Sequence, residues 1–429
     1  MILEIPHRIS VSTSMAYAGP VVVLGAALIS CLALTAPTVA GDWPQWRGPN
    51  RDGLSSETGW QTTWPQAGLK QLWKAEAGTG YGTVSVSKGR LYVLGNTADQ
   101  DIVYCYDANT GQSVWKHTYA CSAKDPNGYH GTRSTPTVDG DSVYTVSRKG
   151  HLFCLDAATG KVKWSKEFPK DFGGKVPTWG YALSPLVEGD LLIVEPGGPE
   201  ASVVALKKAS GEVVWKAGDD PASYSSPMAF DLKGERCVTV FTTKGPVGRS
   251  SKDGKELWRY PWKTSWDVHA ATPIVTGTQV FISSGYNSGC ALIDVSSNPP
   301  KEVWRNKNMR NHANSCVLWK GYFYGFDESE LKCLDFATGD VKWAEKKYSK
   351  GSVMLADGKL ILYSNRAKLG LAEATPDGYK ELAYVPALEM REKYPGGANK
   401  DTWAVPVLAN GKIYCRSHDD LVCLDVKAQ

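Results

Sequence analysis

The chain has 429 residues, with 48 Lys and Arg against 44 Asp and Glu, and therefore a formal net charge of +4. Charges of both signs are spread along it without long blocks, which excludes the electrostatic footprint of a nucleic-acid-binding protein and a disordered acidic or basic tail. Hydrophobic residues make up 42% of the sequence, enough for a large core, and the unusual feature is the content of 16 Trp and 43 Gly.

The N-terminal segment contains an uncharged apolar run from Val21 to Ala36, followed by small residues up to Ala40. This pattern predicts a signal peptide over residues 1–40, and hence an exported protein of a bacterial periplasm or cell envelope. Two alternatives stay open. The run could be an uncleaved membrane anchor, or a lipobox-like sequence could place a lipid on Cys31. Membrane association is expected only in those two cases.

Residues 41–68 form a leader that contains Trp43, Trp46, Trp60 and Trp64 and lies outside the repeats that follow. From residue 69 onward the chain repeats itself with a period of about 45 residues. Each unit reads as short apolar strands separated by Gly turns, then Asp-x-x-Thr-Gly, then Trp. The clearest copy runs from Ser134 to Trp164. The other copies end at Trp115, Trp215, Trp258, Trp304 and Trp343.

The repeated turn has a physical explanation in the clearest copy. The Asp156 carboxylate can cap nearby backbone N–H groups, and Gly160 supplies the positive φ that ends the loop. The Trp then falls on the outermost strand, where its large surface can pack against the next unit. Four-stranded units of this length, apolar on both faces and without a helical pattern, predict a β-propeller.

The number of blades follows from the copies. Six Trp-ended copies precede a degenerate seventh that ends near Leu382. The remaining piece, Trp403–Gln429, supplies three strands, and residues 69–73 supply the missing fourth. The sequence therefore predicts an all-β, eight-bladed propeller over residues 69–429, closed by an N-terminal strand that leaves no open edge.

Cysteines recur at one position of the repeat, as Cys105, Cys154, Cys333 and Cys423. A residue that repeats with the folding unit is most simply a small buried hydrophobe. Equivalent positions on separate blades do not converge on one point, so we expect neither a disulfide framework nor a thiolate metal site.

The segments ANTGQSVW, AATGKVKW, ASGEVVW and ATGDVKW resemble the tryptophan-docking repeats of pyrroloquinoline quinone (PQQ)-type eight-bladed propellers. The resemblance covers residues 69–427. It implies the fold strongly and the activity weakly, because the family includes quinoprotein alcohol dehydrogenases as well as non-catalytic BamB-type outer-membrane assembly scaffolds. The leader sequence WPQWRGP resembles an N-terminal segment of PQQ-repeat proteins of uncharacterised role.

Loops that lead into the innermost strands meet at one rim of a propeller channel, and here they are rich in aromatic and polar residues. We expect a binding site at this rim, with a core set of candidates: Arg133, Trp179, Tyr181, Trp266, His269, Asn311, His312 and Trp403. Further residues of the same loops are Tyr81, His130, Tyr224, Asp267, Lys350 and Asp401. The three histidines of these loops, His130, His269 and His312, belong to different blades, so we expect no metal site from them.

Two functions remain in competition. The favoured one is a non-catalytic, monomeric binding or assembly scaffold whose partners are other exported or envelope proteins. The alternative is a PQQ-dependent alcohol dehydrogenase with calcium, for which the resemblance implies Trp179 as stacking plane, Arg133 for the cofactor carboxylates, Asn311 at the calcium and Asp267 as catalytic base. No two cysteines are adjacent, unlike many such dehydrogenases, and eight blades leave little room for insertions that roof a cofactor. Carbohydrate stacking on the rim aromatics is a third possibility.

Overall fold

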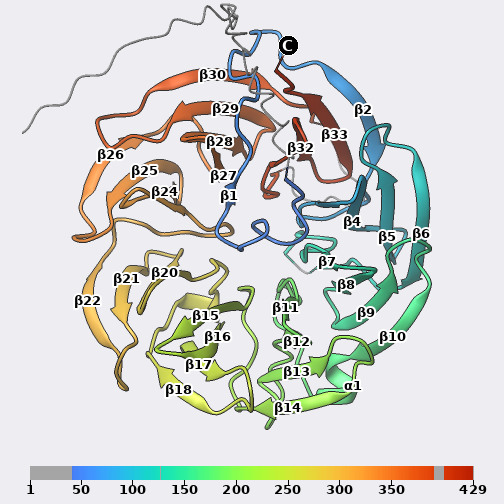
Figure 1. The fold of residues 1–429 in the computed structure, drawn as a ribbon, viewed down its shortest axis with the longest axis vertical. Coiled ribbons are helices and arrows are strands. Elements are labelled where there is room, and N and C mark those ends of the chain that lie inside the picture. The colour runs from blue at the N-terminus through green and yellow to red at the C-terminus, as the bar shows by residue number, and fades with distance from the viewer. Residues whose placement is uncertain (1–40, 126, 391–400, 429) are drawn as a thin grey trace, which may run out of the picture. The chain divides into compact units, whose positions relative to one another are not determined.

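The computed structural model describes residues 41–125, 127–390 and 401–428, and the predicted signal peptide, including Cys31, lies outside the described residues. Eight antiparallel sheets of four strands stand around a common axis (Figure 1), and β1 (Leu54–Ser55) adds a short parallel strand to one of them. Within these ranges the helices are α1 (Phe168–Phe172) and the 3-10 helix η1 (Ser265–Asp267). None of the described helices has the length and hydropathy needed to cross a membrane.

The strands follow one another from the axis outward in every blade. Blade one consists of β3 (Ser85–Ser87), β4 (Arg90–Thr97), β5 (Gln100–Asp107) and β6 (Ser113–Ala120), and blade two of β7 (Thr137–Asp139), β8 (Ser142–Val146), β9 (His151–Asp156) and β10 (Val162–Glu167). Blade three consists of β11 (Leu186–Glu188), β12 (Leu191–Val194), β13 (Val203–Lys207) and β14 (Val213–Ala217). Blade four consists of β15 (Met228–Leu232), β16 (Glu235–Thr242), β17 (Gly245–Ser250) and β18 (Glu256–Arg259).

Blade five consists of β19 (Ile274–Thr276), β20 (Gln279–Ser284), β21 (Gly289–Asp294) and β22 (Lys301–Asn306), and blade six of β23 (Val317–Trp319), β24 (Tyr322–Asp327), β25 (Glu330–Asp335) and β26 (Val341–Glu345). Blade seven consists of β27 (Gly351–Ala356), β28 (Lys359–Ser364), β29 (Lys368–Glu373) and β30 (Glu381–Pro386). Blade eight consists of β31 (Val407–Ala409), β32 (Lys412–Arg416), β33 (Asp420–Asp425) and β2 (Gln71–Glu76).

The eighth blade closes the ring with strands from both ends of the repeat region, as the sequence predicts. Strand β2 pairs antiparallel with β33, with Trp73 opposite Cys423 and Glu76 opposite Asp420. In Figure 1 the blue strand β2 lies beside the red strands β32 and β33. The prediction of an eight-bladed propeller closed by an N-terminal strand is confirmed.

Six of the seven Trp that end repeats dock onto the turn of the following blade. The indole N–H of Trp115 donates to the Ala157 carbonyl oxygen at 3.0 Å, and the same bond joins Trp73, Trp164, Trp215, Trp304 and Trp343 to the next blade. Gly160 lies flat under the Trp115 ring, where a Cβ would stand 2.5 Å from the ring. Gly160 also has a φ of 72°, and Asp156 accepts the N–H groups of Ala158 and Thr159, as expected from the turn.

Trp258 departs from this pattern. It is fully buried, but its indole N–H has no hydrogen-bond partner. The physical reason lies in the next blade, where the residues after Asp294 read Val-Ser-Ser-Asn-Pro-Pro in place of the Asp-x-x-Thr-Gly turn. The recurring cysteines are buried between blades, and all nine cysteines of the described ranges are unpaired, in line with a packing role.

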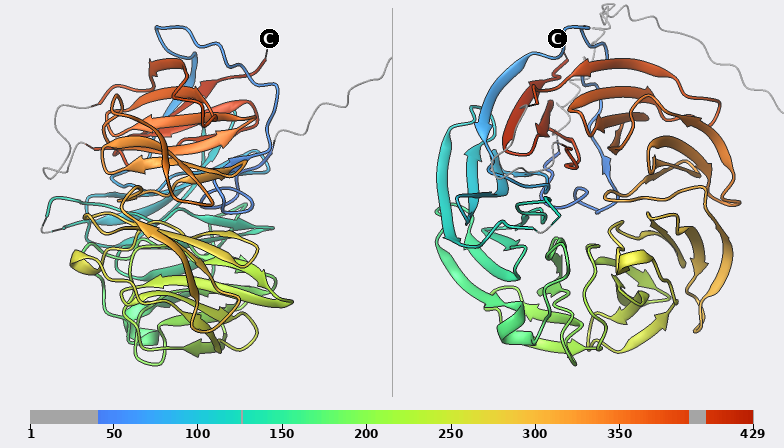
Figure 2. Two further views of the ribbon diagram at one scale, coloured as in Figure 1. Left: turned by 90° about the vertical axis from the view of Figure 1, so that its left-hand side faces the viewer. Right: turned by 180° about the vertical axis from the view of Figure 1, so that it is seen from behind.

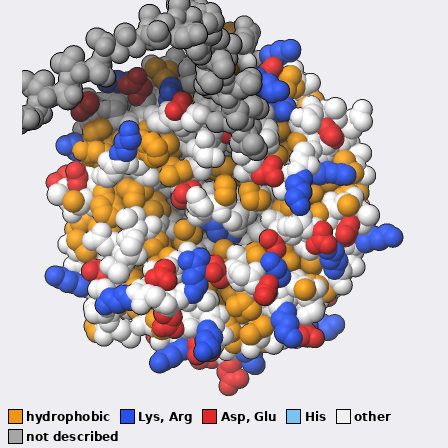
Figure 3. Space-filling view, in the orientation of Figure 1, with side chains coloured by type: hydrophobic (Ala, Val, Ile, Leu, Met, Phe, Trp, Pro, Cys, Tyr) orange, Lys and Arg blue, Asp and Glu red, His pale blue; other side chains and the backbone are white. Residues whose placement is uncertain are grey.

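The leader packs against the ring rather than standing apart from it. Its Trp43 exchanges two backbone hydrogen bonds of 2.8 Å with Val86 of β3, and Leu54 pairs with Leu355 of β27. Figure 2 (left) shows the blue leader on one side of the ring and the yellow helix η1 on the other. The part of this face that Figure 3 leaves uncovered carries interspersed basic, acidic and apolar side chains.

Buried arginines anchor the leader to the channel wall. The Arg47 guanidinium donates to the Cys316 carbonyl oxygen of blade six at 2.9 Å. The Arg51 guanidinium donates to the carbonyl oxygens of Ser184 and Pro185 in blade three, at 2.9 and 3.0 Å. These contacts join two blades that are not neighbours, three and six, to one short segment of the leader.

Candidate functional site

The loops that lead into the innermost strands surround a pocket on the axis, with about 930 Å³ of empty space when its open mouth is included. We call it the axial pocket. Its wall combines aromatic rings with small side chains, and it is lined by Trp46, Tyr81, Tyr129, Arg133, Trp179, Ala182, Ser184, Tyr224, Ser226, Val268, Ala270, Tyr286, His312, Ala313, Asn314 and Trp403.

Four residues of the predicted core set meet in the axial pocket. Arg133 precedes β7, Trp179 precedes β11, His312 precedes β23 and Trp403 precedes β31. Tyr81 and Tyr224, which the same reasoning placed at the rim, join them. Since each of these residues enters from a different blade, the ring closure assembles the site.

The other four residues of the core set do not line the pocket, and in two of them, Tyr181 and Trp266, the side chain points away from it although neighbouring residues of the same loops line it. Tyr181 is fully buried within blade three, where its hydroxyl donates to the Pro196 carbonyl oxygen at 2.8 Å and its ring meets Phe168 edge-on. Trp266 stands at helix η1 with 74% of its surface exposed and a φ of 69°. It therefore lies on the same face as the pocket but does not line it.

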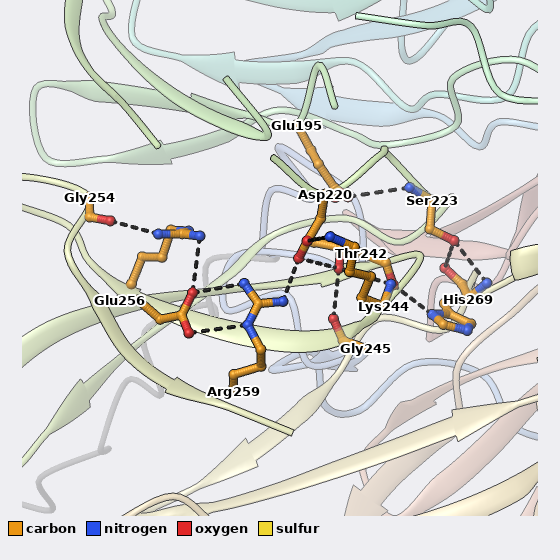
Figure 4. A network of polar contacts seen from close by, with 11 residues as sticks. Glu195, Asp220, Ser223, Thr242, Lys244, Gly245, Gly254, Glu256, Arg259 and His269 are labelled. Carbon is orange, nitrogen blue, oxygen red and sulfur yellow. Dashed lines mark hydrogen bonds and ion pairs between the residues drawn. The ribbon is translucent and has the colours of Figure 1, made fainter. Parts of the chain in front are cut away.

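His269 belongs to a buried polar network beneath the rim (Figure 4). Its Nδ1 lies 2.7 Å from the Thr242 carbonyl oxygen, and its backbone N–H donates to the Ser223 hydroxyl at 3.0 Å. Burial lowers the pKa of His269 to about 4, so the ring is neutral at pH 7. In the same network burial raises the pKa of the Glu195 carboxyl well above its usual range. The network holds the loop that presents Tyr224, which makes His269 a supporting residue.

The other rim candidates also have structural partners outside the pocket. Asn311 is buried and donates from Nδ2 to the Phe326 carbonyl oxygen at 3.0 Å. His130 accepts the Asp125 N–H at Nδ1. Asp267 is exposed beside Trp266 at helix η1 and does not line the pocket. Lys350 borders a neighbouring hollow with Glu328, and Asp401 lies 3.8 Å from Arg366.

Sequence reasoning missed three aromatic residues of the pocket. Trp46 comes from the leader, and its indole N–H donates to the Thr272 hydroxyl at 2.9 Å, which holds its ring in the pocket wall. Tyr286 lies on the turn between β20 and β21, outside the loops considered. Tyr129 is the direct neighbour of His130 in the rim loop that leads into β7, so the sequence carried an aromatic residue there that could have been included among the candidates. No sequence signal placed Trp46 on the axis.

The rings of the pocket are held in fixed pairs. Trp403 stacks with Tyr129, with ring centroids 5.1 Å apart and planes at 30°. Trp179 meets Tyr224 edge-on at 5.9 Å, and Tyr286 meets His312 edge-on at 4.8 Å. Such pairs fix ring orientation, so the pocket offers preorganised flat apolar surfaces to a ligand.

The residues present do not fit a calcium-bound quinone. Arg133 and Trp179 reach the axial pocket, but Asn311 and Asp267, the types expected at the calcium and as base, do not line it. The described lining contains no Asp or Glu, whereas calcium binds oxygen ligands that include carboxylates. Among the described residues no group of three or more His, Cys, Asp or Glu could hold a metal ion.

Solved structures share the fold at low sequence identity. BamB from Moraxella catarrhalis matches with a TM-score of 0.59 and 14% identity, over 84% of this chain and 98% of that one. Quinohemoprotein alcohol dehydrogenase from Comamonas testosteroni matches with a TM-score of 0.62 and 14% identity, over 90% and 81%. The quinohemoprotein alcohol dehydrogenase ADHIIG from Pseudomonas putida HK5 gives 0.63 and 13%, over 91% and 81%. These likenesses show the propeller fold alone.

Two curated relatives match parts of the chain. Tetrathionate hydrolase of Acidithiobacillus ferrooxidans is 23% identical over 239 residues, which cover 51% of this chain and 44% of that protein. Protein Rv3035 of Mycobacterium tuberculosis is 33% identical over 116 residues, which cover 27% and 26%. The chain therefore spans less than half of the length of these relatives. The family model described as outer membrane protein assembly factor BamB matches residues 98–345, more than half of the chain, and the chain belongs to this PQQ_2 family.

Proposed function

We propose that this protein is a non-catalytic binding or assembly scaffold of the bacterial cell envelope, which receives another exported protein on the face that carries the axial pocket. The family description and the apolar N-terminal run support export and an envelope role. The observation that carries the proposal is the lining of the axial pocket, which is rich in aromatic rings and has no carboxylate among its described residues.

The titratable groups of the pocket support binding better than proton transfer. General acid–base catalysis at neutral pH needs a positioned group with a pKa near 7. Burial raises the pKa of Tyr224 to about 12 and also raises that of Tyr81. Burial lowers the pKa of His312, whose ring packs edge-on against Tyr286. Trp, Tyr and Arg are, by contrast, the side chains that dominate binding energy at protein interfaces.

Site-specific photocrosslinking in cells tests the scaffold role. A photoreactive amino acid at Trp266, exposed on the pocket face, is expected to give an adduct with an envelope protein. The matched control carries it at Val303, exposed on the outermost strand β22 of the same blade. The Trp179→Ala change in the axial pocket should abolish the Trp266 adduct. The proposal is wrong if no adduct forms, or if both positions give the same adduct.

The alternative function is a PQQ-dependent oxidoreductase, favoured by the joint presence of Arg133 and Trp179 at the axial pocket. Dye-linked alcohol oxidation after incubation with PQQ and Ca²⁺ distinguishes the two proposals. The scaffold proposal expects no turnover above a control without quinone. Saturable turnover that is lost in Arg133→Gln would replace it with the oxidoreductase.

A further inference from the structure

Helix η1 contains a pair of strained residues beside the axial pocket. Trp266 and Asp267 have φ values of 69° and 54°, in the left-handed region that side chains rarely adopt. Two further pairs of adjacent non-glycine residues with positive φ among the described residues, Ala98–Asp99 and Tyr286–Asn287, lie in β-hairpin turns, where the paired strands impose this geometry. Helix η1 lies between two blades, so no strand pairing imposes the strain there. Such strain is typical of switch regions and ligand clamps.

The Trp266 side chain is exposed although aromatic rings lie nearby. It is 74% exposed, more than any other large hydrophobic side chain of the described ranges. Val268, two residues further on, lines the axial pocket, and two residues span at most about 7 Å of chain. Tyr224, another lining residue, lies beside the same loop, since its N–H donates to the His269 carbonyl oxygen at 3.3 Å. The indole therefore lies within reach of the pocket mouth, where burial against Tyr224 would stabilise it.

The Ser223 hydroxyl holds the loop in its exposed position. This hydroxyl belongs to the buried network of Figure 4 and donates to the Asp267 carbonyl oxygen at 2.8 Å. The His269 carbonyl oxygen lies 3.4 Å from the same hydroxyl, so a second acceptor is already in place. If the loop moves, Ser223 keeps a hydrogen bond, and the carbonyl oxygen of the exposed Asp267 bonds to water. The hydrogen bonds of the network therefore oppose the movement only weakly.

The segment that can move is short because both of its ends are held. The Thr264 hydroxyl donates to the Val268 carbonyl oxygen at 3.2 Å, which closes the base of the loop. Beyond Val268, the buried His269 ring is hydrogen-bonded to the Thr242 carbonyl oxygen. The three residues of η1 lie between these fixed points, so a change of their backbone moves the Trp266 indole and leaves the pocket wall in place.

We infer that η1 is a gate of the axial pocket, and the structure shows its open position. In the closed position Trp266 and Asp267 leave the left-handed region, and the indole covers the pocket mouth beside Tyr224. The Ser223 hydroxyl then donates to the His269 carbonyl oxygen. The gate controls access to the pocket, and the inference rests on the proposed function only in taking the axial pocket as the binding site.

The labelling rate of a cysteine in the axial pocket measures how often the gate is open. Ala182 lines the pocket from blade three, and the nine native cysteines of the described ranges are buried, so Ala182→Cys supplies the reactive thiol for a reagent such as iodoacetamide. Asp267→Gly removes strain from the open position and should label at least as fast as Ala182→Cys alone. Asp267→Val opposes a positive φ and should label about fivefold or more slowly.

Two controls separate gating from a general disturbance. Trp266→Ala in the Asp267→Val background should restore the fast rate, because the indole that covers the mouth is absent. Val303→Cys, on the outermost strand β22, should label at one rate in every background. Equal rates in Asp267→Gly and Asp267→Val, or a slow rate that persists without the Trp266 indole, would overturn the inference.

Fluorine NMR of the protein labelled with 5-fluorotryptophan keeps the inference testable if a variant fails to fold. The Trp266 resonance, assigned by its loss in Trp266→Phe, should show exchange between two environments on the microsecond to millisecond timescale. A single exposed resonance without exchange would overturn the gate. Flat labelling rates with intact photocrosslinking remove the gate alone, whereas loss of the crosslink with gated labelling removes the scaffold role alone.

Discussion

The contact between Gly160 and Trp115 gives the sharpest quantitative prediction about how neighbouring blades hold together. Gly160 has a φ of 72°, and a Cβ at this position would lie 2.5 Å from the Trp115 ring. Gly140 in the same blade has a φ of 60° but nothing within 4 Å of such a Cβ. Changing each glycine to Ala therefore separates backbone strain from the steric contact.

The expected magnitudes follow from these two terms. A non-glycine residue in the left-handed region costs about 1–2 kcal/mol, which both Gly140→Ala and Gly160→Ala incur. Overpacking against a buried ring costs a further ~1–3 kcal/mol, which only Gly160→Ala incurs. In a Trp115→Ala background the ring is absent, so the excess cost of Gly160→Ala should disappear.

Urea denaturation followed by far-UV circular dichroism and by Trp fluorescence gives the free energies of unfolding for this double-mutant cycle. Equal destabilisation by Gly140→Ala and Gly160→Ala would refute the docking explanation. The same conclusion would follow if the cost of Gly160→Ala persisted in the Trp115→Ala background.

Three further predictions concern ring closure, pH dependence and the leader. Deletion of residues 69–73 removes half of β2 together with Trp73. This deletion should abolish the cooperative thermal transition that circular dichroism measures. Unchanged thermal melting would contradict closure of the ring through the eighth blade. The pKa of His269 is about 4 in the folded protein, against 6.5 in the unfolded chain. Because the unfolded state takes up the proton first, the free energy of unfolding should fall as the pH drops from 6.5 to 4, by at most ~3 kcal/mol. His269→Asn should flatten this part of the pH profile of the urea midpoint, and an equally steep profile would contradict the assignment. Arg51→Met removes the buried donor of the Ser184 carbonyl oxygen, while the Pro185 carbonyl oxygen keeps the Thr137 hydroxyl as donor. The change should cost about 1–3 kcal/mol in urea denaturation, against less than ~1 kcal/mol for the exposed Arg366→Met, and equal costs would contradict the anchoring role.

The sequence determined the architecture because the repeat encodes local geometry. Asp156 and Gly160 specify one turn, and the Trp that follows specifies the outer strand and its contact with the next blade. Repetition of this unit fixed the number of blades, and the missing fourth strand at the C-terminus pointed to residues 69–73 as its replacement. Each of these inferences uses contacts between residues that are near in sequence or equivalent in the repeat.

The sequence located the rim that carries the axial pocket but not the full lining of the pocket. Every blade contributes a rim loop, so the repeat placed Arg133, Trp179, His312 and Trp403 on one rim, where they line one pocket. It could not tell these residues from their neighbours that turn into the blade, because the direction of a loop side chain depends on packing with the adjacent blade. Tyr181 and His269 lie only a few residues from lining positions and yet are fully buried.

The tertiary structure alone decided what the leader does. No repeat relates Trp46 or Arg51 to the blades, and their contacts join residues more than a hundred positions apart. The leader is held against the ring by buried guanidinium groups, which donate to carbonyl oxygens of blades three and six. The sequence thus determined the ring through local and periodic contacts, whereas the axial pocket exists only once the rim loops of several blades and Trp46 of the leader have come together.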